Sequence, residues 1–477
     1  MEAGLRKKVL WLATRDLRLL DNPALSKAAL SGDTLCLFVM DKNLIDSAKI
    51  GLNRLTFLSE SLTDLRRQLR ATDSELFVRY GNYESEVLAF AKSTGIDEVH
   101  ITIDYSGYAK ARNAKLQSLL QAENIVLVTH PGGAVIEPGV IRPHEGNFYK
   151  VFTPYYRNWE PWPRRALPAL PAELTGHYDG EPGRILSTEE VTALLAEAIL
   201  HRASFRNGTL GKERGKFLLH LSPYRALGGE EKARERLAHF IDSGNIFSYA
   251  GASNDLESDS TSRISPYLHF GCISPLSVEQ AVLTAYSATY AEGDQNSSVA
   301  AGNSIDGEQA VASVQAFVRQ LCWRDFYLQF ADGFSQLATA NYRERPYEWN
   351  TDTDALISWM NGETGQDIVD AAMLQLQEEG YVHNRARLIA SSYLSKTLKI
   401  DWRHGLNHYD SLLSDADFSS NAGNWQWMAG TGTDTRPNRV LSPKRQAERF
   451  DPNGSYRKRY LSESRSSIQS PGEQRLF

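Results

Sequence analysis

Residues 415–434 read DADFSSNAGNWQWMAGTGTD, and we expect the helical part of the chain to be organised around them. Two carboxylates, Asp415 and Asp417, come before two indoles, Trp425 and Trp427. Carboxylates accept hydrogen bonds from the N–H groups of a heterocycle, and the small residues before the first indole let a flat ring approach the backbone. A buried helix–loop segment with two core tryptophans is the simpler interpretation of this stretch taken alone.

The composition is that of a globular chain with room for two domains. There are 477 residues, 42% of them hydrophobic, and the formal net charge is −6. No run of eighteen apolar residues occurs, and the N-terminus lacks the pattern of a secretory signal, so neither a membrane span nor export is expected. Three widely spaced cysteines argue against a disulfide framework and a cysteine-based metal site, and they predict a reducing, cytoplasmic environment; they are Cys36, Cys272 and Cys322.

Short apolar runs alternate with helical patterns over residues 1–130. The runs begin at Val9, Thr34, Leu76, Glu98 and Ile125. Leucines recur at helical spacing between the second and third runs, and another helical pattern separates the fourth run from the fifth. This alternation predicts an α/β domain with a doubly wound parallel sheet. The first run is followed by ATRDLRL rather than by a glycine-rich dinucleotide fingerprint.

The rest of the chain divides into three further parts. Residues 131–200 are rich in proline, glycine and aromatic residues, and they predict a long interdomain linker. Helical patterns dominate residues 201–463, which we expect to form an all-α domain. Within it, the small-residue stretch 288–313 predicts a mobile insertion. A polar tail over residues 464–477 is expected to be disordered.

Two patterns suggest phosphate binding, and each also has a simpler explanation. Basic residues concentrate in 202–225 and 436–459, which favours a local phosphate-binding surface, although a solvated basic face explains a single such run. Around Arg263 the sequence STSRISP places hydroxyls just before a helix. That arrangement suits a pyrophosphate, or it is an ordinary N-cap followed by proline.

Two helical segments carry polar and aromatic side chains that could line a cavity. From Phe317, the residues Gln320, Trp323, Arg324 and Tyr327 follow at three- and four-residue spacing, which suits a cavity for an unstacked base or plain amphipathic packing.

The second segment, GYVHNRARLIASSYL, begins at Gly380 and contains Arg385 and Arg387. A buried arginine needs a partner, and Asp415 is a candidate. His404 and His408 lack the third ligand of a metal site, so we expect surface or capping histidines there and no bound metal.

Taken together, the motifs resemble one family. TSRIS, QLCWRDFY, HNRAR and DADFSSNAGNWQW occur in that order, and they are similar to the FAD-binding half of the DNA photolyase/cryptochrome family. RDLRLLDNPAL from Arg15 and KVFTPYYRNW from Lys150 are similar to its N-terminal half. The resemblance covers roughly residues 9–462 and is greatest to class I cyclobutane pyrimidine dimer photolyases.

The resemblance implies positions for a bound FAD, for electron transfer and for DNA. The residues implied to bind FAD are Tyr249, Thr261, Ser262, Arg263, Ile264, Ser265, Phe317, Arg324, Arg387, Asp415, Ala416, Asp417 and Asn421, with Asn421 beside flavin N5. The implied electron path from flavin to surface is Trp425, Trp402 and Trp349. The implied catalytic positions are Gln320, Trp323, Asn384 and Asn421. The implied DNA contacts are Gln320, Trp323, Arg324, Tyr327, Asn384, Arg385, Trp427, Arg439 and Gln446.

The implied activity is light-driven repair of cyclobutane pyrimidine dimers by an electron from reduced FAD, with the dimer flipped out of UV-damaged DNA. A cryptochrome-type photoreceptor without repair activity is the alternative, and a structural DNA-binding protein with a vestigial flavin site is a third reading. Asn421 stands where many plant cryptochromes have Asp and many animal ones Cys, which favours a photolyase. Three positions depart from the usual pattern: Gln320 replaces Glu, Leu388 replaces a frequent Met, and Ser253 replaces a frequent Arg.

A second, light-harvesting chromophore is also implied. Asp104, in DYSGYAKAR, and Arg54 are closer to members that bind 8-hydroxydeazaflavin than to those that bind methenyltetrahydrofolate, which often have Glu where Tyr108 stands. Surface pairing of Asp104 and Arg54 is the alternative interpretation. We expect the protein to act as a monomer.

Overall fold

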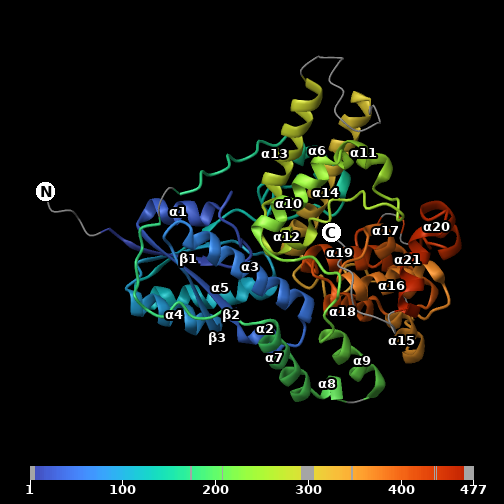
Figure 1. Ribbon diagram of the computed structural model, residues 1–477, viewed down its shortest axis with the longest axis horizontal. Helices are drawn as coiled ribbons and strands as arrows, with labels where there is room; N and C mark the ends of the chain where they lie inside the picture. Colours follow the sequence, from blue (N-terminus) through green and yellow to red (C-terminus); the bar gives the residue numbers. More distant parts are fainter. Residues whose placement is uncertain are drawn as a thin grey trace.

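The computed structural model describes residues 6–171, 174–206, 208–291, 306–344, 348–434, 436 and 438–466 (Figure 1). A sheet with its covering helices occupies one side of the molecule, and a larger body of helices occupies the other. A long irregular segment joins the two parts along the outside of the sheet. The predicted fold class, an α/β part followed by a helical part, is confirmed.

All five strands of the sheet are parallel and lie in the order β3-β2-β1-β4-β5. The central strand β1 pairs on both sides, with Leu10 opposite Leu35 of β2 and Val99 of β4. Parallel neighbours need helical crossovers, and the alternating sequence pattern supplies them. The strands are β1 (Lys8–Ala13), β2 (Asp33–Asp41), β3 (Leu76–Gly81), β4 (Glu98–Thr102) and β5 (Val126–His130).

Helices cover both faces of the sheet, as a doubly wound arrangement requires. Alternate residues of a strand face opposite sides. Accordingly, Val9 and Trp11 belong to the core that contains residues of α1 and α3, while Leu10 and Leu12 belong to the core under α4 and α5. Burial on both faces explains why the strands are almost wholly apolar. The helices of this part are α1 (Pro23–Ser31), α2 (Lys42–Asp46), α3 (Leu52–Arg70), α4 (Tyr83–Thr94) and α5 (Gly107–Ala122).

The segment that follows the sheet contains two helices that the sequence analysis did not predict, α6 (Phe152–Trp159) and α7 (Thr188–His201). The start of α7 has a local signal, because Ser187 and Glu190 form a reciprocal capping box. Between the two helices the chain runs along the edge strand β3, where Val78 donates its backbone N–H to the carbonyl of Pro182 at 2.8 Å. Part of the segment therefore protects an exposed sheet edge.

Helices build the remainder of the structure. Apart from an isolated bridge between Asn350 and Ile400, the described residues beyond β5 form helices and loops. These helices are α8 (Ala203–Arg206), α9 (Gly208–Leu218), α10 (Glu230–Asp242), α11 (Asn245–Ala252), α12 (Ser265–Phe270), α13 (Pro275–Tyr286), α14 (Gly307–Gly333), α15 (Thr353–Asn361), α16 (Asp367–Glu379), α17 (Asn384–Ser392), α18 (Trp402–Leu412), α19 (Phe418–Ala429), α20 (Pro443–Phe450) and α21 (Ser455–Ser466), with π-helical turns at Ser287–Ala291 and Tyr393–Thr397.

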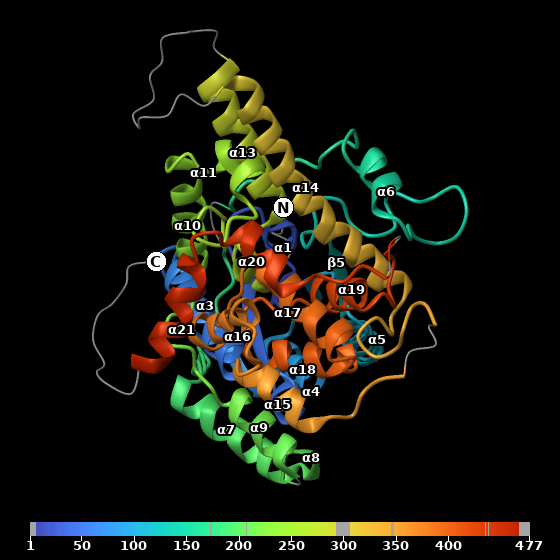
Figure 2. The ribbon, with the colours of Figure 1, turned by 90° about the vertical axis from the view of Figure 1, so that its right-hand side faces the viewer.

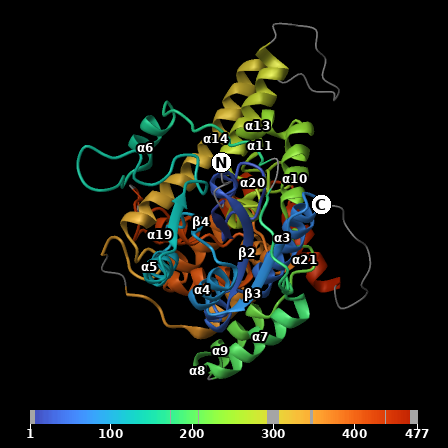
Figure 3. The ribbon, with the colours of Figure 1, turned by 90° about the vertical axis from the view of Figure 1, so that its left-hand side faces the viewer.

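The long helices fix the outline of the helical part. Helix α14 runs diagonally along one side of it, beside α13 and above α19 (Figure 2). Helices α7, α8 and α9 lie at the opposite end of the molecule from the free end of α13 (Figure 3). The described helices include none that is both long and apolar enough to cross a membrane.

Two predicted irregular segments fall largely outside the described residues. Most of the insertion predicted at 288–313 is outside them, and its last residues, from Gly307, belong to α14. The tail predicted from residue 464 is outside them beyond Ser466, where α21 ends.

The two parts of the molecule meet through α3 and the end of β1. Asn53 donates to the carbonyl of Leu412 at 2.6 Å and to the hydroxyl of Ser222 at 2.8 Å. A side chain on Gly51 would collide with the carbonyl of Ser411, so glycine permits the close approach of α3 to α18. Arg15, just beyond β1, reaches Asp417 at 2.6 Å. The floor of the site described next is therefore braced by the sheet.

Candidate functional site

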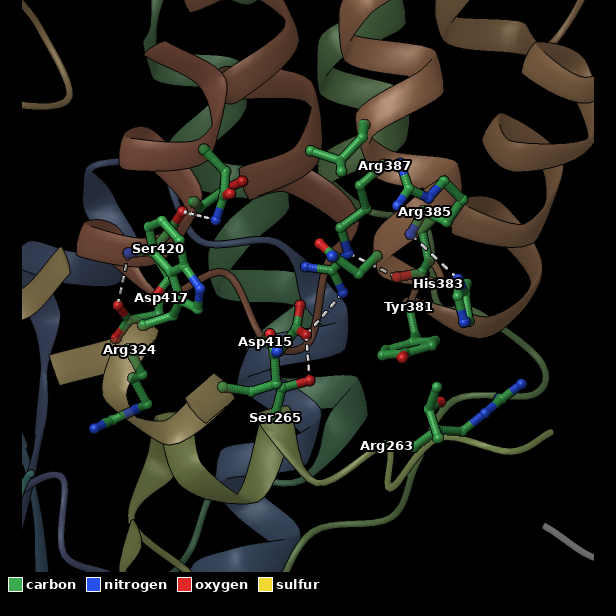
Figure 4. A pocket seen from close by; sticks show the side chains of 18 of the residues that line it. Arg263, Ser265, Arg324, Tyr381, His383, Arg385, Arg387, Asp415, Asp417 and Ser420 are labelled. Carbon is green, nitrogen blue, oxygen red and sulfur yellow. Dashed lines mark hydrogen bonds and ion pairs between the residues drawn. The ribbon is translucent and has the colours of Figure 1, made fainter. Parts of the chain in front are cut away.

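A cavity of about 570 Å³ opens within the helical part. That volume lies in the usual range for sites that hold a cofactor or small ligand. Its wall comes from α11, α12, α14, α17, α18 and α19 and from the loops before α12, α17 and α19 (Figure 4). Cationic and anionic side chains share the wall with aromatic rings; the charged ones are Arg263, Arg324, Arg385, Arg387, Asp415 and Asp417.

Asp415 lies at the centre of the wall, between Ser265 and Arg387 (Figure 4). The Oδ2 atom of Asp415 accepts from the guanidinium of Arg387 at 2.8 Å and from the hydroxyl of Ser265. The Oδ1 atom is buried and has no hydrogen-bond partner in the part of the chain that the structure describes. Burial works against the charge of Arg387, but Asp415 outweighs it and raises the arginine pKa. An unpaired buried carboxylate oxygen is costly, so this atom is suited to a donor N–H of a ligand.

Asp417 differs from Asp415 in that both of its carboxylate oxygens are bonded within the protein. Its Oδ1 atom caps α19 by accepting from the backbone N–H groups of Ser419 and Ser420, both at 3.1 Å. Its Oδ2 atom accepts from Arg15, and His269 stands 3.8 Å away. Burial opposes its ionisation, but these cationic and hydrogen-bonding neighbours outweigh burial and hold the Asp417 pKa well below its usual range. This carboxylate therefore orients α19 and joins it to the sheet.

The loop before α12 is held from behind. Arg263 has a φ of +49°, a left-handed conformation that is costly for a residue with a side chain. Its guanidinium bonds Glu379 at 2.8 Å and Asp259 at 2.7 Å, and these acids raise its pKa against the effect of burial. The guanidinium of Arg236 donates to the backbone carbonyls of Thr261 and Ser262, at 2.9 and 2.8 Å. Strain supported by several bonds is typical of a loop shaped for a ligand.

Helix α14 provides an aromatic wall at the mouth of the cavity. Trp323 stacks on Phe152 of α6 with ring centroids 3.5 Å apart and planes 3° from parallel. Trp427 meets the same indole edge-on at 5.7 Å. Gln320 lies exposed at this rim, and among the described residues its amide bonds only the carbonyl of Ala316, at 3.3 Å. Helix α6 was not predicted from the sequence, but it supports Trp323, which was predicted to belong to the site.

The start of α17 carries a polar pair beside a basic surface. Asn384 is exposed at the cavity, while Arg385 donates twice to Oδ1 of Asn254, at 3.0 and 2.6 Å. Burial lowers the Arg385 pKa, and the neighbouring charges of Arg439 and Arg449 lower it further. Cations that repel one another at one place gain most from an anion bound among them.

The three tryptophans of the predicted electron path lie at different depths. Trp425 is buried in the wall, and its ring fills the space in front of Gly405, where a Cβ atom would clash with it. Trp402 is on the same helix as Gly405, one turn earlier, and is fully buried with its N–H on Asn341 at 3.0 Å. Trp349 is half-buried at the margin of the same core.

Trp425 also touches a second group of rings. Tyr409 lies 5.0 Å from it and Trp359 lies 6.0 Å from it, both edge-on. The sequence analysis did not consider this group. It offers a second set of oxidisable rings in contact with the cavity wall.

The cavity gathers most of the predicted site residues. Those in its wall are Tyr249, Thr261, Ser262, Arg263, Ile264, Ser265, Phe317, Gln320, Trp323, Arg324, Tyr327, Asn384, Arg385, Arg387, Asp415, Asp417, Asn421, Trp425 and Trp427.

Other predicted positions lie outside the wall of this cavity, and their predicted roles stay predictions. Ala416 is buried behind the wall, where its carbonyl accepts from Arg54 at 3.4 Å. Arg439 is exposed outside the cavity, and Gln446 lies outside it on α20. Arg54 points to three backbone carbonyls, those of Lys49, Asp410 and Ala416, rather than into either described cavity.

Asp104 lines a second cavity of about 30 Å³, together with Arg15. That volume is far below the roughly 300–1,000 Å³ typical of ligand sites and is too small for a tricyclic ring. The structure therefore does not bring Asp104 and Arg54 together into one of the two cavities, and the assignment of a second chromophore to them stays a prediction.

The structure also corrects the expectation for the histidines and adds residues to the site. His408 is fully buried against Phe217 and Trp359, so it is neither a surface nor a capping residue. Wall residues that the sequence analysis missed include Tyr381, His383, His269 and Tyr409. The signal available for His383 is its place immediately before a helix, where it caps the backbone N–H of Arg385.

Comparison with known proteins agrees with the family resemblance found in the sequence. One family model, described as DNA photolyase, matches residues 8–172, and another, described as the FAD binding domain of DNA photolyase, matches residues 317–471. A deoxyribodipyrimidine photo-lyase of Streptomyces griseus is 36% identical over 448 residues, which make up 93% of this chain and 87% of that protein. The protein of the same name from Halobacterium salinarum is 32% identical over 469 residues, 94% of this chain and 88% of that one.

A solved structure extends the likeness to the whole fold. The crystal structure of a bacterial class III photolyase from Agrobacterium tumefaciens is similar with a TM-score of 0.77 and 26% sequence identity. The likeness covers 99% of this chain and 91% of that one. The closer likeness to class I enzymes stays a prediction.

Proposed function

We propose that this chain, which belongs to the DNA photolyase/cryptochrome family, is a deoxyribodipyrimidine photo-lyase that repairs cyclobutane pyrimidine dimers in DNA with light. The observation that carries the proposal is the cavity itself. It contains the buried carboxylate of Asp415, of which only one oxygen is hydrogen-bonded to described residues. It also has aromatic and basic side chains around its opening, among them Trp323 and Arg385. The first feature suits a heterocyclic cofactor, and the second suits a damaged base.

FAD fits the donors and acceptors of the wall. The free Oδ1 of Asp415 can accept from a ring N–H, while Arg387 bonds the other oxygen of that carboxylate. Tyr249 and the loop from Thr261 to Ser265 would hold the pyrophosphate side, and Asn421 would meet the N5 edge of the flavin. Bound FAD, reduced and excited by light, supplies the electron that splits the dimer. No His or Cys is expected to attach it covalently, so heat or acid should release intact FAD.

The mouth of the cavity provides what a flipped-out dimer needs. Trp323, held rigid by Phe152, presents an aromatic face, and Gln320 and Asn384 present amides that can bond base carbonyls and N–H groups. Damaged bases stack poorly, so extruding them costs less than extruding normal bases. Tyr327 and Trp427 complete this side of the wall.

Backbone phosphates would bind beside the mouth. Burial and then the charges of Arg439 and Arg449 lower the Arg385 pKa at this place, and exposed Lys444 and Arg445 lie on the same helix as Arg449. Arg324 also faces the cavity, although its guanidinium is bonded to the carbonyl of Gly133 at 2.5 Å. Local positive charge thus lets a chain of net charge −6 bind a polyanion.

The tryptophans would restore the reduced cofactor. We expect Trp425 in the wall, the buried Trp402 and the half-buried Trp349 to act as a series of indoles that leads outward. Their role is to pass electrons inward; the splitting of the dimer does not need them. Loss of an outer indole should therefore impair photoreduction and spare repair by chemically reduced protein.

The finer assignments follow from the same reasoning. We place the antenna domain at residues 1–130, the linker at 131–200 and the FAD-binding domain at 201–463, and we expect a cytoplasmic monomer. A second chromophore, 8-hydroxydeazaflavin rather than methenyltetrahydrofolate, remains part of the proposal. Binding of 8-hydroxydeazaflavin at Asp104 would require the small cavity there to widen.

A repair assay tests the proposal. FAD-loaded, chemically reduced protein is mixed with an oligonucleotide that carries one thymine dimer and is exposed to blue light, with a dark sample as control. Thymine restored in the illuminated sample but not in the dark control supports the photo-lyase assignment. FAD binding and photoreduction without repair would indicate the alternative, a cryptochrome-type photoreceptor. The observation that favours this alternative is Gln320, which stands where cyclobutane-dimer enzymes usually have Glu. DNA binding by protein that takes up no FAD would overturn both.

A further inference from the structure

The amide of Asn421 has a neighbour behind the cavity wall. Asn421 is buried on α19 and lines the cavity, four residues before Trp425. Its Nδ2 atom donates to Oδ1 of Asp410 at 2.8 Å. Asp410 is on α18 and does not line the cavity. A carboxylate therefore holds, from behind, a polar side chain that a ligand would meet from the front.

The protonation state of Asp410 decides which end of this amide faces the ligand. An ionised carboxylate can only accept, so it binds the NH₂ group of Asn421 and leaves the Oδ1 atom for the cavity. A protonated carboxyl group can instead donate to Oδ1, and the NH₂ group then turns towards the cavity. The two ends of an amide have almost the same shape, so the wall accommodates either orientation.

The surroundings of Asp410 set its charge. Arg54 of α3 donates to its backbone carbonyl at 2.6 Å, and Lys49 and Asp417 are the other charged residues that act on it. Burial raises the Asp410 pKa to about 6, and Asp417 adds to this effect. Arg54, Lys49 and the bond from Asn421 work in the opposite direction. The carboxyl group thus changes its charge within the pH range in which the protein can be studied.

We propose that Asp410 is a positioning residue that selects, through Asn421, the redox state of the bound flavin. This inference rests on the proposed function, which places the N5 edge of FAD against Asn421. Reduced flavin carries an N–H donor at N5, whereas oxidised flavin offers only an acceptor there. Ionised Asp410 presents an oxygen to that edge and favours the reduced flavin; protonated Asp410 frees the NH₂ group to favour the oxidised one.

A purely electrostatic role for Asp410 predicts the opposite sign. Asp410→Asn removes a negative charge near the flavin, which by itself makes electrons easier to add. If the carboxylate instead positions the amide, Asp410→Asn releases Asn421, and the oxidised flavin gains the hydrogen bond. Reduction then becomes harder. The direction of the change therefore separates the two roles.

The experiment is a spectroelectrochemical titration of FAD-loaded protein from pH 5 to pH 8. At pH 8, the ratio of reduced to oxidised flavin at a fixed potential should fall about two- to tenfold in Asp410→Asn, the worth of one hydrogen bond. At pH 5, native and variant should agree. Asn407→Asp, which adds a charge at an exposed position of the same helix, should behave like the native protein at both pH values.

Two results would overturn the inference: a rise of that ratio in Asp410→Asn at pH 8, or a difference from native that is the same at pH 5 and pH 8. If Asp410→Asn fails to fold or to bind FAD, the native protein alone decides, because its potential should depart from the behaviour of a simple one-proton couple near pH 6. A native profile without that departure rejects the inference. Failure of native protein to bind FAD would instead reject the proposed function.

Discussion

Arg387 and Asp415 form an ion pair of 2.8 Å. One carboxylate oxygen of Asp415, Oδ2, accepts both of the hydrogen bonds donated to this carboxylate by described side chains, those of Arg387 and Ser265. The other oxygen, Oδ1, is buried and left for a ligand. An ion pair built only for stability would be expected to satisfy both oxygens. The asymmetry of this pair is therefore the clearest local sign of a binding site.

The first prediction concerns that free oxygen. Asp415→Asn should weaken FAD binding by about 1.5–3 kcal/mol, the worth of a hydrogen bond to a charged group, because the amide must bond Arg387 and the ring N–H with a single oxygen. FAD affinity is measured by fluorescence titration of apoprotein. Thermal unfolding of the apoprotein is recorded in parallel, because Arg387 loses its partner. Asp354→Asn, at an exposed position of α15, is the matched control and should bind FAD as the native protein does.

The second prediction concerns the route of electrons. Trp402→Phe should remove most of the light-driven reduction of FAD, since phenylalanine is far harder to oxidise than indole, and chemically reduced Trp402→Phe should still repair. Trp359→Phe interrupts the other rings next to Trp425 and should leave photoreduction near native. Transient absorption after a flash measures both. Normal photoreduction in Trp402→Phe with a loss in Trp359→Phe would place the route through the second group of rings.

The third prediction concerns the lesion contact at Gln320. Its amide is exposed and only weakly bonded before a lesion enters, so it is free to donate to a thymine carbonyl. Gln320→Leu removes the donor and should lower repair yield by about 1–3 kcal/mol in free-energy terms if the closed site is dry. Gln320→Glu should keep FAD binding and make repair depend on pH. Native yield in Gln320→Leu would show that residue 320 does not contact the dimer.

The fourth prediction concerns acid stability through Asp417. Its pKa is lower in the folded protein than in the unfolded chain, so its ionisation stabilises the fold above about pH 4, and this stabilisation disappears as the pH falls through the folded value. Asp417→Asn keeps the helix cap but breaks the pair with Arg15. It should cost about 3 kcal/mol at pH 7.

Thermal unfolding between pH 3 and pH 7 checks this prediction. The gap between native protein and Asp417→Asn should be constant near pH 7 and should narrow as the pH falls below about 4. A constant gap between them would mean that the carboxylate charge is not the source of the stability. Arg15→Gln, alone and combined with Asp417→Asn, tests whether the two residues act as a pair.

The fifth prediction concerns DNA phosphates. Arg439→Gln should weaken binding to damaged and undamaged DNA by a similar factor and reduce the slope of log affinity against log salt by about 1. Lys212→Gln removes the same charge from an exposed position of α9, at the far end of the molecule, and should leave the slope unchanged (Figure 1). A loss confined to damaged DNA would instead assign Arg439 to the lesion.

The sequence determined the parts of this protein that depend on neighbours along the chain. Apolar runs such as that from Val9 predicted strands, and leucines at helical spacing predicted α3, because strand and helix repeats are local. Motif order identified the family and most of the cavity wall. The local rule was sufficient even for α7, whose capping box at Ser187 was overlooked.

The tertiary structure decided which distant groups meet. Arg15 and Asp417 are 402 residues apart, and no repeat or cap along the chain predicts their pairing. The same holds for the free Oδ1 of Asp415 and for the Asp410 carboxylate behind Asn421. A side chain's partners depend on how helices and sheet pack, and packing is fixed by shape and burial across the whole core rather than by local hydrogen bonding. Residue types therefore indicated the kind of site, while only the packed fold decided which atoms are satisfied and which remain for a ligand.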